Sequence, residues 1–269
     1  MKPPLKRFGQ NFLIDKNIVL KILNVVGVSK KDAVLEIGPG RGALTFEMAR
    51  HAGKFCAVEV DRDLTRELAK SLSIFDNAEI VLSDILEFDL AEYALKKGIK
   101  KFRVVGNLPY YITTPILEYL FKNIQYVEDI FITVQKEVAD RMTACAGSKD
   151  YGSLSCFVSY YSCPRVLFKI KKGSFWPVPK VESAFVHLKA NGPKKNELGI
   201  KSESMFFDCM RRSFGQRRKR LLGSLSALVK KEDLSRLPCV ELLKKRPEEL
   251  TLKDFAKVSN QIFDFLGQR

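Results

Sequence analysis

The chain has 269 residues, of which 46% are hydrophobic and 29% are charged, so it is too apolar for a disordered protein and long enough to bury a large core. Lys and Arg number 46 against 31 Asp and Glu, which gives a formal charge of +15. This imbalance favours a polyanionic partner, and because no lipid-anchoring motif is visible, we expect nucleic acid rather than a membrane.

Short apolar runs alternate with helical patterns along the first half of the chain. The runs predicted to be buried strands are residues 33–38, 55–60, 78–85, 102–107 and 129–135. Between them, "ALTFEMARHA", "DLTRELAKSL" and "TPILEYLFKN" carry apolar residues three or four apart, which is typical of amphipathic helices. Strand and helix alternation predicts an α/β fold with a parallel sheet and right-handed crossovers.

The second half of the chain changes character. Runs around "SCFVSYYS" and "SAFVHLKA" are candidates for antiparallel edge strands. From "NGPKKNELG" (191–199) the composition turns polar, and helical patterns then resume without strands. We therefore predict two domains, an α/β domain over residues 1–190 and a small helical domain over residues 191–269.

The six cysteines include no C-x-x-C pair, and the chain has two histidines to help bind a metal. This pattern favours free thiols in a reducing compartment over a zinc site or a disulfide framework, and we expect no metal. The start, "MKPPLKRFGQNFL", lacks the apolar stretch of a secretory signal, and nowhere do 18 apolar residues run together. A cytoplasmic protein is expected.

Three consecutive strand ends carry residues suited to a nucleotide-like ligand. Gly38 and Gly40 of "EIGPGRGALT" permit a tight turn and close approach of a ligand to the backbone. Glu59 ends the next strand, where a carboxylate accepts hydrogen bonds from ribose hydroxyls, and Asp84 ends the third, where it can accept from an exocyclic amine. Taken alone, the glycines could form a plain strand-to-helix turn, and each acid could simply cap a helix. The glycine spacing by itself also does not exclude a dinucleotide as the ligand.

The fourth strand end, "FRVVGNLPYYI", distinguishes these ligands. Asn107 offers a side-chain carbonyl, and Pro109 removes a backbone donor after it, which leaves nearby carbonyls free to accept. Tyr110 supplies a flat aromatic face. Together these residues predict a pocket that binds an amine and stacks on its ring.

The stretch "NLPYYITTPIL" closely resembles the KsgA-type rRNA adenine dimethyltransferases. The resemblance also covers "GQNFL", "EIGPGRGALT", Glu59, Asp84, "FWPVPKVESAF" and "SFGQRRKRLL", and so nearly the whole chain. It implies a Rossmann-like sheet that binds S-adenosylmethionine, and a small C-terminal helical domain. The implied reaction is dimethylation of N6 in two adjacent adenosines of the 3′-terminal hairpin loop of 16S rRNA, within the small subunit or its precursor, with a role in ribosome biogenesis.

The resemblance also implies roles for individual residues. The implied cofactor contacts are Gln10, Asn11 and Leu13, which close over it, Gly38 and Gly40 in the turn, Glu59 at the ribose, Asp84 at the adenine, and Asn107. The implied contacts of the target base are Asn107, Leu108 through its carbonyl, Pro109, Tyr110, and Phe175 on the opposite face. Trp176 stands where the family pattern has a smaller residue, and we expect it to serve hydrophobic packing.

A basic cluster follows in the helical region, with six cations in ten residues. Because nucleic acids are held largely through their phosphates, we predict that these side chains form an RNA-binding helix surface, with a solvated helix face as the alternative. The residues are Arg211, Arg212, Arg217, Arg218, Lys219 and Arg220.

Two other functions remain open at this point. One is the resistance-type methyltransferase that modifies adenine N6 in 23S rRNA and shares the cofactor motifs. The other is a non-catalytic nucleic-acid-binding factor of the same fold, which would be expected to lose residues at the methyl-transfer site. Glu59, Asp84, Asn107, Pro109 and Tyr110 are all present, which argues against the non-catalytic factor. The tyrosine-rich "NLPYYITTPIL" and the basic "SFGQRRKRLL" favour the 16S rRNA enzyme over the 23S enzyme, and we expect it to act as a monomer.

Overall fold

The computed structural model describes residues 10–267, and the chain divides into two compact units. The sheet unit contains the chain up to Ala139 together with Cys163–Gly192, and the helical unit contains Asp140–Ser162 together with the chain from Pro193 onward. The predicted boundary after residue 190 lies close to the last crossing between the units. The prediction did not include residues 140–162 in the helical domain, although they pack with the C-terminal helices. The predicted lack of a secretory signal concerns the start of the chain, of which residues 1–9 lie outside the described part.

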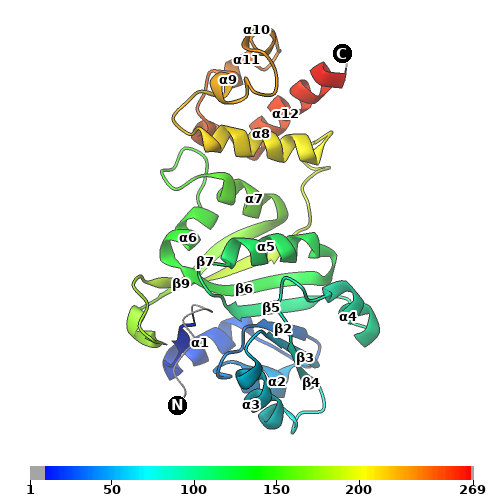
Figure 1. Ribbon diagram of the computed structural model, residues 1–269, viewed down its shortest axis with the longest axis vertical. Coiled ribbons are helices and arrows are strands. Elements are labelled where there is room, and N and C mark those ends of the chain that lie inside the picture. The colour runs from blue at the N-terminus through cyan, green and yellow to red at the C-terminus, as the bar shows by residue number, and fades with distance from the viewer. Residues whose placement is uncertain (1–9, 268–269) are drawn as a thin grey trace. The chain divides into compact units, whose positions relative to one another are not determined.

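Within the described residues, the sheet unit is built on seven strands (Figure 1). In spatial order they are β4 (Ala78–Leu82), β3 (Lys54–Glu59), β2 (Ala33–Ile37), β5 (Phe102–Asn107), β6 (Val127–Gln135), β9 (Ser183–Ala190) and β7 (Ser162–Ile170). The first five strands run parallel, and β9 pairs antiparallel with β6. The five predicted strands and an antiparallel strand at "SAFVHLKA" are therefore confirmed. This strand was expected at the edge of the sheet, but it lies between β6 and β7.

Six α-helices of the described chain belong to the sheet unit. They are α1 (Lys16–Val26), α2 (Thr45–His51), α3 (Arg62–Leu72), α4 (Leu90–Lys97), α5 (Thr113–Lys122) and α6 (Lys136–Met142), which crosses into the helical unit. Three of them, α2, α3 and α5, lie close to the predicted helical patterns. Asp61 begins α3 by accepting the backbone N–H groups of Asp63 and Leu64, a standard N-cap. Ile22, Met48 and Leu72 pack into one buried cluster with Phe55 and Val105 of the sheet. Strands β2 and β3 are buried along nearly their whole length, as expected of parallel strands covered on both faces.

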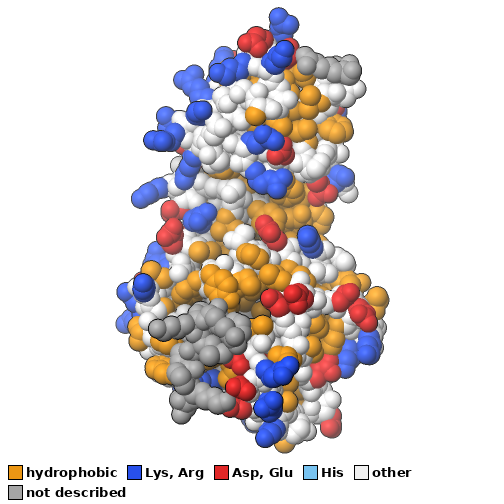
Figure 2. Space-filling model, viewed as in Figure 1, with side chains coloured by type: hydrophobic (Ala, Val, Ile, Leu, Met, Phe, Trp, Pro, Cys, Tyr) orange, Lys and Arg blue, Asp and Glu red, His pale blue; other side chains and the backbone are white. Residues whose placement is uncertain are grey.

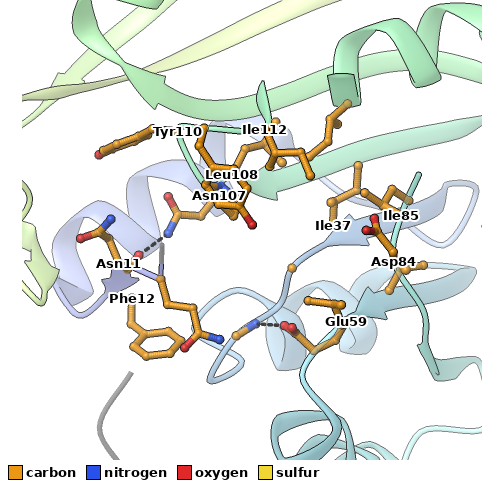
Figure 3. Close-up of a pocket in the computed structure, with 18 of the residues that line it drawn as sticks. Asn11, Phe12, Ile37, Glu59, Asp84, Ile85, Asn107, Leu108, Tyr110 and Ile112 are labelled. Atoms are coloured by element: carbon orange, nitrogen blue, oxygen red, sulfur yellow. Dashed lines mark hydrogen bonds between the residues drawn. The ribbon is translucent and has the colours of Figure 1, made fainter. Parts of the chain in front are cut away.

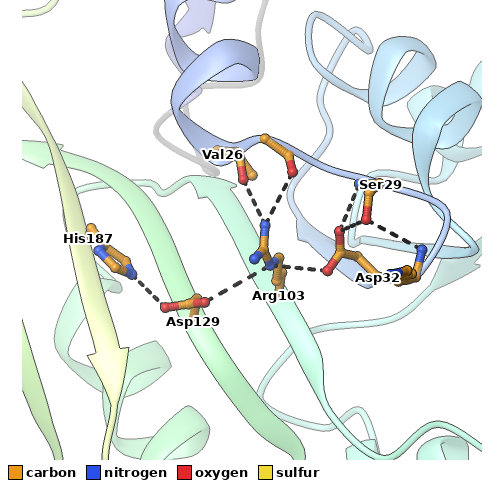
Figure 4. A network of polar contacts seen from close by, with 8 residues as sticks. Val26, Ser29, Asp32, Arg103, Asp129 and His187 are labelled. Carbon is orange, nitrogen blue, oxygen red and sulfur yellow. Dashed lines mark hydrogen bonds and ion pairs between the residues drawn. The ribbon is translucent and has the colours of Figure 1, made fainter.

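An ion-pair network joins the amino ends of the strands, at the edge opposite to the one where β2, β3 and β5 end (Figure 4). Arg103 donates to the backbone carbonyl of Val26 at 2.9 Å, and its Nε lies 3.3 Å from Asp32 and 4.0 Å from Asp129. Asp129 in turn lies 2.6 Å from Nε2 of His187. Partly buried pairs of this kind are costly to break because a lone charge is left behind, so the network fixes α1 and β9 to the sheet.

The helical unit has its own buried core. Its helices are α7 (Ser153–Tyr161), α8 (Glu203–Gly215), α9 (Leu221–Ser224), α10 (Lys231–Leu234), α11 (Val240–Leu243) and α12 (Leu252–Gly267). Helix α12 buries Phe255, Val258, Ser259 and Ile262, whose spacing of three and four residues forms one apolar stripe. In the part of the chain that the structure describes, no helix is long and apolar enough to cross a bilayer.

The prediction of a strand at "SCFVSYYS" is wrong, because residues 153–161 form α7 and the strand β7 begins only at Ser162. Its aromatic and β-branched residues favour a strand locally. Tertiary packing decides otherwise: Tyr160 is fully buried, with its ring 5.5 Å from that of Phe206 on α8. The fold of this segment therefore depends on contacts distant in sequence.

Candidate functional site

A pocket opens where β2, β3 and β5 end, the edge at which open α/β sheets bind ligands (Figure 3). It lies entirely within the sheet unit. Its lining includes Gln10, Asn11, Gly38, Gly40, Glu59, Asp84, Asn107, Leu108, Pro109 and Tyr110. The structure thus brings together ten of the twelve residues predicted for the cofactor and target-base sites.

The glycine turn after β2 forms one wall of the pocket. Gly38 and Gly40 have φ angles of +65° and +58°, in the left-handed region that side chains rarely adopt. A Cβ on Gly38 would meet nothing within 4 Å, whereas one on Gly40 would lie 3.0 Å from the ring of Phe12. Gly38 therefore borders open space, and Gly40 lets Phe12 lie against the turn.

Glu59 links this turn to the end of β3. One carboxylate oxygen accepts the backbone N–H of Gly40 at 3.1 Å (Figure 3). The other accepts the backbone N–H of Asp61 at 3.0 Å. Burial raises the pKa of Glu59 above its usual range, although these two hydrogen bonds act in the opposite direction. The carboxylate is 4% exposed and still lines the pocket, so a ligand that donates hydroxyl groups would find an acceptor here.

Asp84 lies two residues beyond the end of β4 and forms another part of the lining. Its Oδ1 accepts the backbone N–H of Leu86 at 2.9 Å, which holds the carboxylate in the turn. Asp84 therefore stabilises the local turn, as many acidic residues do, and also lines the pocket. Ile85, Val60 and Ile37 add apolar surface beside it.

Asn107 ends β5, and its amide orientation is fixed by the N-terminal segment. Its Nδ2 donates to the backbone carbonyl of Asn11 at 2.7 Å (Figure 3). Because a carbonyl can only accept, the amide nitrogen must face Asn11, and Oδ1 is left as an acceptor on the other side of the group. Among the described residues the carbonyl oxygen of Leu108 accepts no hydrogen bond either. Asn107 and Leu108, consecutive residues at the end of β5, therefore each offer one carbonyl acceptor.

Tyr110 is held by a residue that was not singled out from the sequence. Its hydroxyl lies 2.6 Å from Oγ of Ser183, which is fully buried at the start of β9. Strand β9 runs antiparallel, and so it begins at the edge where β6 ends, with Ser183 paired to Gln135. This topology presents Ser183 to the site. Burial raises the pKa of the Tyr110 phenol, and the hydrogen bond with Ser183 lowers it.

Leu13 and Phe175 do not line the pocket, contrary to their predicted roles. Strand β1 (Phe12–Leu13) pairs antiparallel with β8 (Phe175–Trp176), so that Leu13 faces Phe175 and Phe12 faces Trp176 across the ladder. Directly opposed residues share one face of a sheet. Leu13 and Phe175 are 7% and 1% exposed, within the core cluster, so the ring of Phe175 is covered by core residues in this structure.

Phe12 and Trp176 occupy the other face of this small sheet. Phe12 lines the pocket, and Trp176 is 39% exposed rather than packed away as expected. Among the residues that the sequence analysis missed at this site are Phe12, Ile85, Tyr111, Ile112 and Ser183. Each of these residues neighbours a predicted site residue or falls within a motif already noted. Their positions at the site depend on strand register and on contacts between distant parts of the chain.

The basic cluster lies in the helical unit and is not one helix surface. Helix α8 ends at Gly215, so Arg211 and Arg212 lie on the helix, and residues 217–220 lie in the turn before α9. Arg212 pairs with Asp208 at 2.8 Å, and Arg217 donates to the backbone carbonyl of Lys149 at 2.6 Å. Arg211, Arg218, Lys219 and Arg220 are exposed. Lys and Arg side chains are spread over the surface of this unit (Figure 2).

Within residues 10–267 no group of three or more His, Cys, Asp or Glu side chains could hold a metal ion. All six cysteines have free thiols, and burial raises the pKa of Cys56 to about 12. The polar and aromatic groups that line the pocket include the carboxylates of Glu59 and Asp84 and the rings of Phe12 and Tyr110.

Comparison with known proteins agrees with this geometry. Residues 4–262 match the family model described as ribosomal RNA adenine dimethylase. The chain is 42% identical over 262 residues to "Ribosomal RNA small subunit methyltransferase A" of Clostridioides difficile, covering 96% of this chain and 90% of that protein. It is 38% identical over 274 residues to the protein of the same name from Listeria innocua, covering 98% and 92%.

Two solved structures share the fold. A dimethyladenosine transferase from Plasmodium falciparum superposes with a TM-score of 0.78 at 25% identity, covering 92% of this chain and 95% of that one. The 23S rRNA methyltransferase ErmE superposes with a TM-score of 0.69 at 22% identity, covering 94% and 100%, which supports the fold alone. From the family match and the sequence relatives, the chain belongs to the ribosomal RNA adenine dimethylase family.

Proposed function

We propose that this protein transfers methyl groups from S-adenosylmethionine to N6 of two adjacent adenosines in the 3′-terminal hairpin loop of 16S rRNA and dimethylates each. The substrate is the small ribosomal subunit or its precursor. Membership of the adenine dimethylase family and relatives named small-subunit methyltransferases support this function. The observation that carries it is the pair of carbonyl acceptors at the end of β5, with the Asn107 amide fixed by Asn11.

The residues around the glycine turn fit S-adenosylmethionine. When bound, this cofactor supplies an electrophilic methyl group on a sulfonium. The open space beside Gly38 gives it room, the Glu59 carboxylate accepts from ribose hydroxyls, and Asp84 accepts from the adenine amine. Gln10 and Asn11 line the same pocket, and Gln10 donates to Asp61 at 3.4 Å, which ties the N-terminal segment to the end of β3.

Asn107 and Leu108 hold the amine of the target base. An adenine amine is a poor nucleophile because its lone pair is delocalised into the ring. When Oδ1 of Asn107 and the carbonyl of Leu108 accept its two N–H groups, the nitrogen becomes pyramidal and its lone pair turns toward the methyl group. The same carbonyl dipoles stabilise the positive charge that builds on the nitrogen before one of its protons leaves. This chemistry requires no metal.

Tyr110 and Pro109 form part of the proposed binding site for the target base. The Tyr110 ring supplies a stacking face, and its hydroxyl bond to Ser183 fixes the plane of that ring. Pro109 has a fixed φ and no backbone N–H, so it adds no hydrogen-bond donor to this part of the pocket. A base enters such a pocket only when flipped or already unpaired, at a cost of a few kcal/mol that is smallest in a loop, which favours a hairpin loop as the substrate.

The helical unit contributes RNA binding through its basic cluster. Exposed Arg211, Arg218 and Lys219 are placed to contact phosphates, with Arg220 beside them, whereas Arg212 and Arg217 are engaged by Asp208 and Lys149. The net charge of +15 supports a polyanionic partner. We further propose a monomer as the working form of the protein. A cytoplasmic location fits relatives that are named for the ribosomal RNA of the small subunit.

The test is transfer of labelled methyl groups from S-adenosylmethionine to under-methylated small subunits, with large subunits in parallel. We expect label in 16S rRNA, and mass spectrometry of the product should find two neighbouring dimethyladenosines. Label confined to large subunits would point to the 23S rRNA alternative. Binding of subunits without any transfer would point to a non-catalytic factor.

A further inference from the structure

Trp176 is the single tryptophan of the chain and lies opposite Phe12, a residue that lines the pocket. It is 39% exposed, so more than a third of its surface is open to solvent. Its position follows from the two-residue ladder of β1 and β8, in which it pairs with Phe12, a lining residue of the pocket. The indole therefore shares the face that borders the site, while Leu13 and Phe175 anchor the opposite face in the core.

Arg41 fixes the two rings of this face. The central carbon of its guanidinium lies 4.7 Å from the centroid of the Phe12 ring and 5.1 Å from that of Trp176. Both distances are within the range of cation–π contacts. Arg41 follows Gly40 of the glycine turn, and Phe12 also lies against Gly40, so the turn, Phe12 and Trp176 form one rigid assembly. The indole is held in a defined orientation while part of its surface stays open to solvent.

We propose that Trp176 is a stacking platform for the unpaired nucleobase next to the target adenosine, with Arg41 holding the platform in place. The proposal rests on the proposed function, because it takes the substrate to be a single-stranded loop whose target base occupies the pocket. The neighbouring nucleotide is then covalently held near the rim. Proteins bind unpaired bases by stacking them on aromatic rings and arginine planes, and such contacts tolerate any base.

A second aromatic ring at the rim agrees with this reading. Tyr111 lines the pocket and is 64% exposed. It follows Tyr110 directly, so the chain carries one tyrosine fixed inside the site and one open to solvent. Two exposed rings at the mouth of a pocket for a flat base match a substrate with unpaired bases on either side of the target.

Kinetics with under-methylated small subunits provide the first test. Trp176→Ala should raise KM for subunits by about 5- to 100-fold with little change in kcat, as expected for the loss of one stacked base. Trp176→Phe should restore most of the loss, because a ring remains. Val178→Ala, at a position 64% exposed and two residues away, is the matched control and should behave as wild type. Affinity for S-adenosylhomocysteine, measured by calorimetry, should be unchanged in all three variants.

Fluorescence of the single tryptophan provides the second test. A synthetic hairpin with the two adjacent adenosines should quench Trp176 on binding, and an abasic site beside the target should remove most of the quenching. Equal quenching by the abasic hairpin, quenching by S-adenosylhomocysteine alone, or an unchanged KM in Trp176→Ala would each overturn the proposal. A wild-type protein without methyl transfer would instead contradict the proposed function, so the two failures are distinguishable.

Discussion

The side-chain amide of Asn107 donates a 2.7 Å hydrogen bond to the backbone carbonyl of Asn11, which precedes it by 96 residues. The bond decides which end of the amide faces the pocket. It also means that the N-terminal segment, besides lining the site, orients the group that we assign to the substrate amine. The orientation of the Asn107 side-chain carbonyl therefore depends both on β5 and on the N-terminal segment.

Replacing Asn107 by Ala should reduce methyl transfer by more than about 100-fold, since a positioned dipole at the reacting atom is lost. Affinity for S-adenosylhomocysteine should stay within about 3-fold, because Gly38, Glu59 and Asp84 are unchanged. Single-turnover transfer and calorimetry measure the two effects. Asn24→Ala, at an exposed position on α1, is the control and should keep full activity. Substantial transfer by Asn107→Ala would remove Asn107 as the partner of the amine.

Tyr110→Phe and Ser183→Ala each remove one partner of the 2.6 Å bond that fixes the tyrosine ring. Each change should lower kcat/KM for subunits by about 5-fold, the equivalent of one net hydrogen bond. The double variant should be no slower than the slower single variant, because both changes break the same contact. Ser183→Thr, which keeps a hydroxyl, should recover activity. Multiplicative losses in the double variant would show that the two side chains act independently.

Glu36 makes the stability of the sheet unit depend on pH. It is 3% exposed beneath the glycine turn, accepts the Thr45 hydroxyl at 2.7 Å, and burial raises its pKa from 4.5 to about 8. The folded chain thus keeps a proton that the unfolded chain releases between pH 4.5 and 8. Stability is highest at the low end of this window and falls as pH rises through it, by up to about 5 kcal/mol.

Glu36→Gln removes this ionisation while keeping the shape of the side chain. We expect the variant to lose less stability than wild type between pH 5 and pH 9, which thermal unfolding at intermediate pH values would measure. Glu67→Gln changes an exposed glutamate on α3 and should follow the wild-type profile. Parallel profiles for Glu36→Gln and wild type would mean that Glu36 ionises normally.

The basic cluster is best tested at Arg218 and Lys219, since Arg217 is engaged by the Lys149 carbonyl. Replacing both by Ala should weaken binding of small subunits and lower the slope of log affinity against log salt by roughly 1.5 to 2, if each contacts one phosphate. Lys253→Ala with Lys257→Ala removes the same charge from exposed positions on α12. An equal change in slope for both pairs would assign the effect to net charge alone.

Much of the sheet unit could be predicted from local pattern, because its strands are continuous apolar runs and its ligand residues stand where those runs end. Gly38, Glu59, Asp84 and Asn107 reach one pocket simply because parallel strands end at one edge. Helix α7 was missed because its composition favours a strand, and packing against Phe206 outweighs that preference.

The roles of the two aromatic residues of β8 could not be predicted in the same way. In a two-residue strand, register alone decides which side chain enters the core, and a shift by one residue exchanges them. The sequence shows both Phe175 and Trp176 but not their pairing with Leu13 and Phe12. Likewise, the contact between Tyr110 and Ser183 joins residues 73 positions apart, which no local pattern records.

The path of the chain between the two units limits how this protein can be cut and recombined. It passes from one unit to the other after residues 139, 162 and 192, and Tyr151, Cys156 and Tyr160 from the inserted stretch complete the core around α8 and α12. A fragment that starts at residue 193 would lack these side chains and expose the apolar surface that they cover. A chimaera joined to a relative near residue 190 would combine halves of two different cores. Grafting the helical unit onto another enzyme would therefore require transplanting two separate segments together.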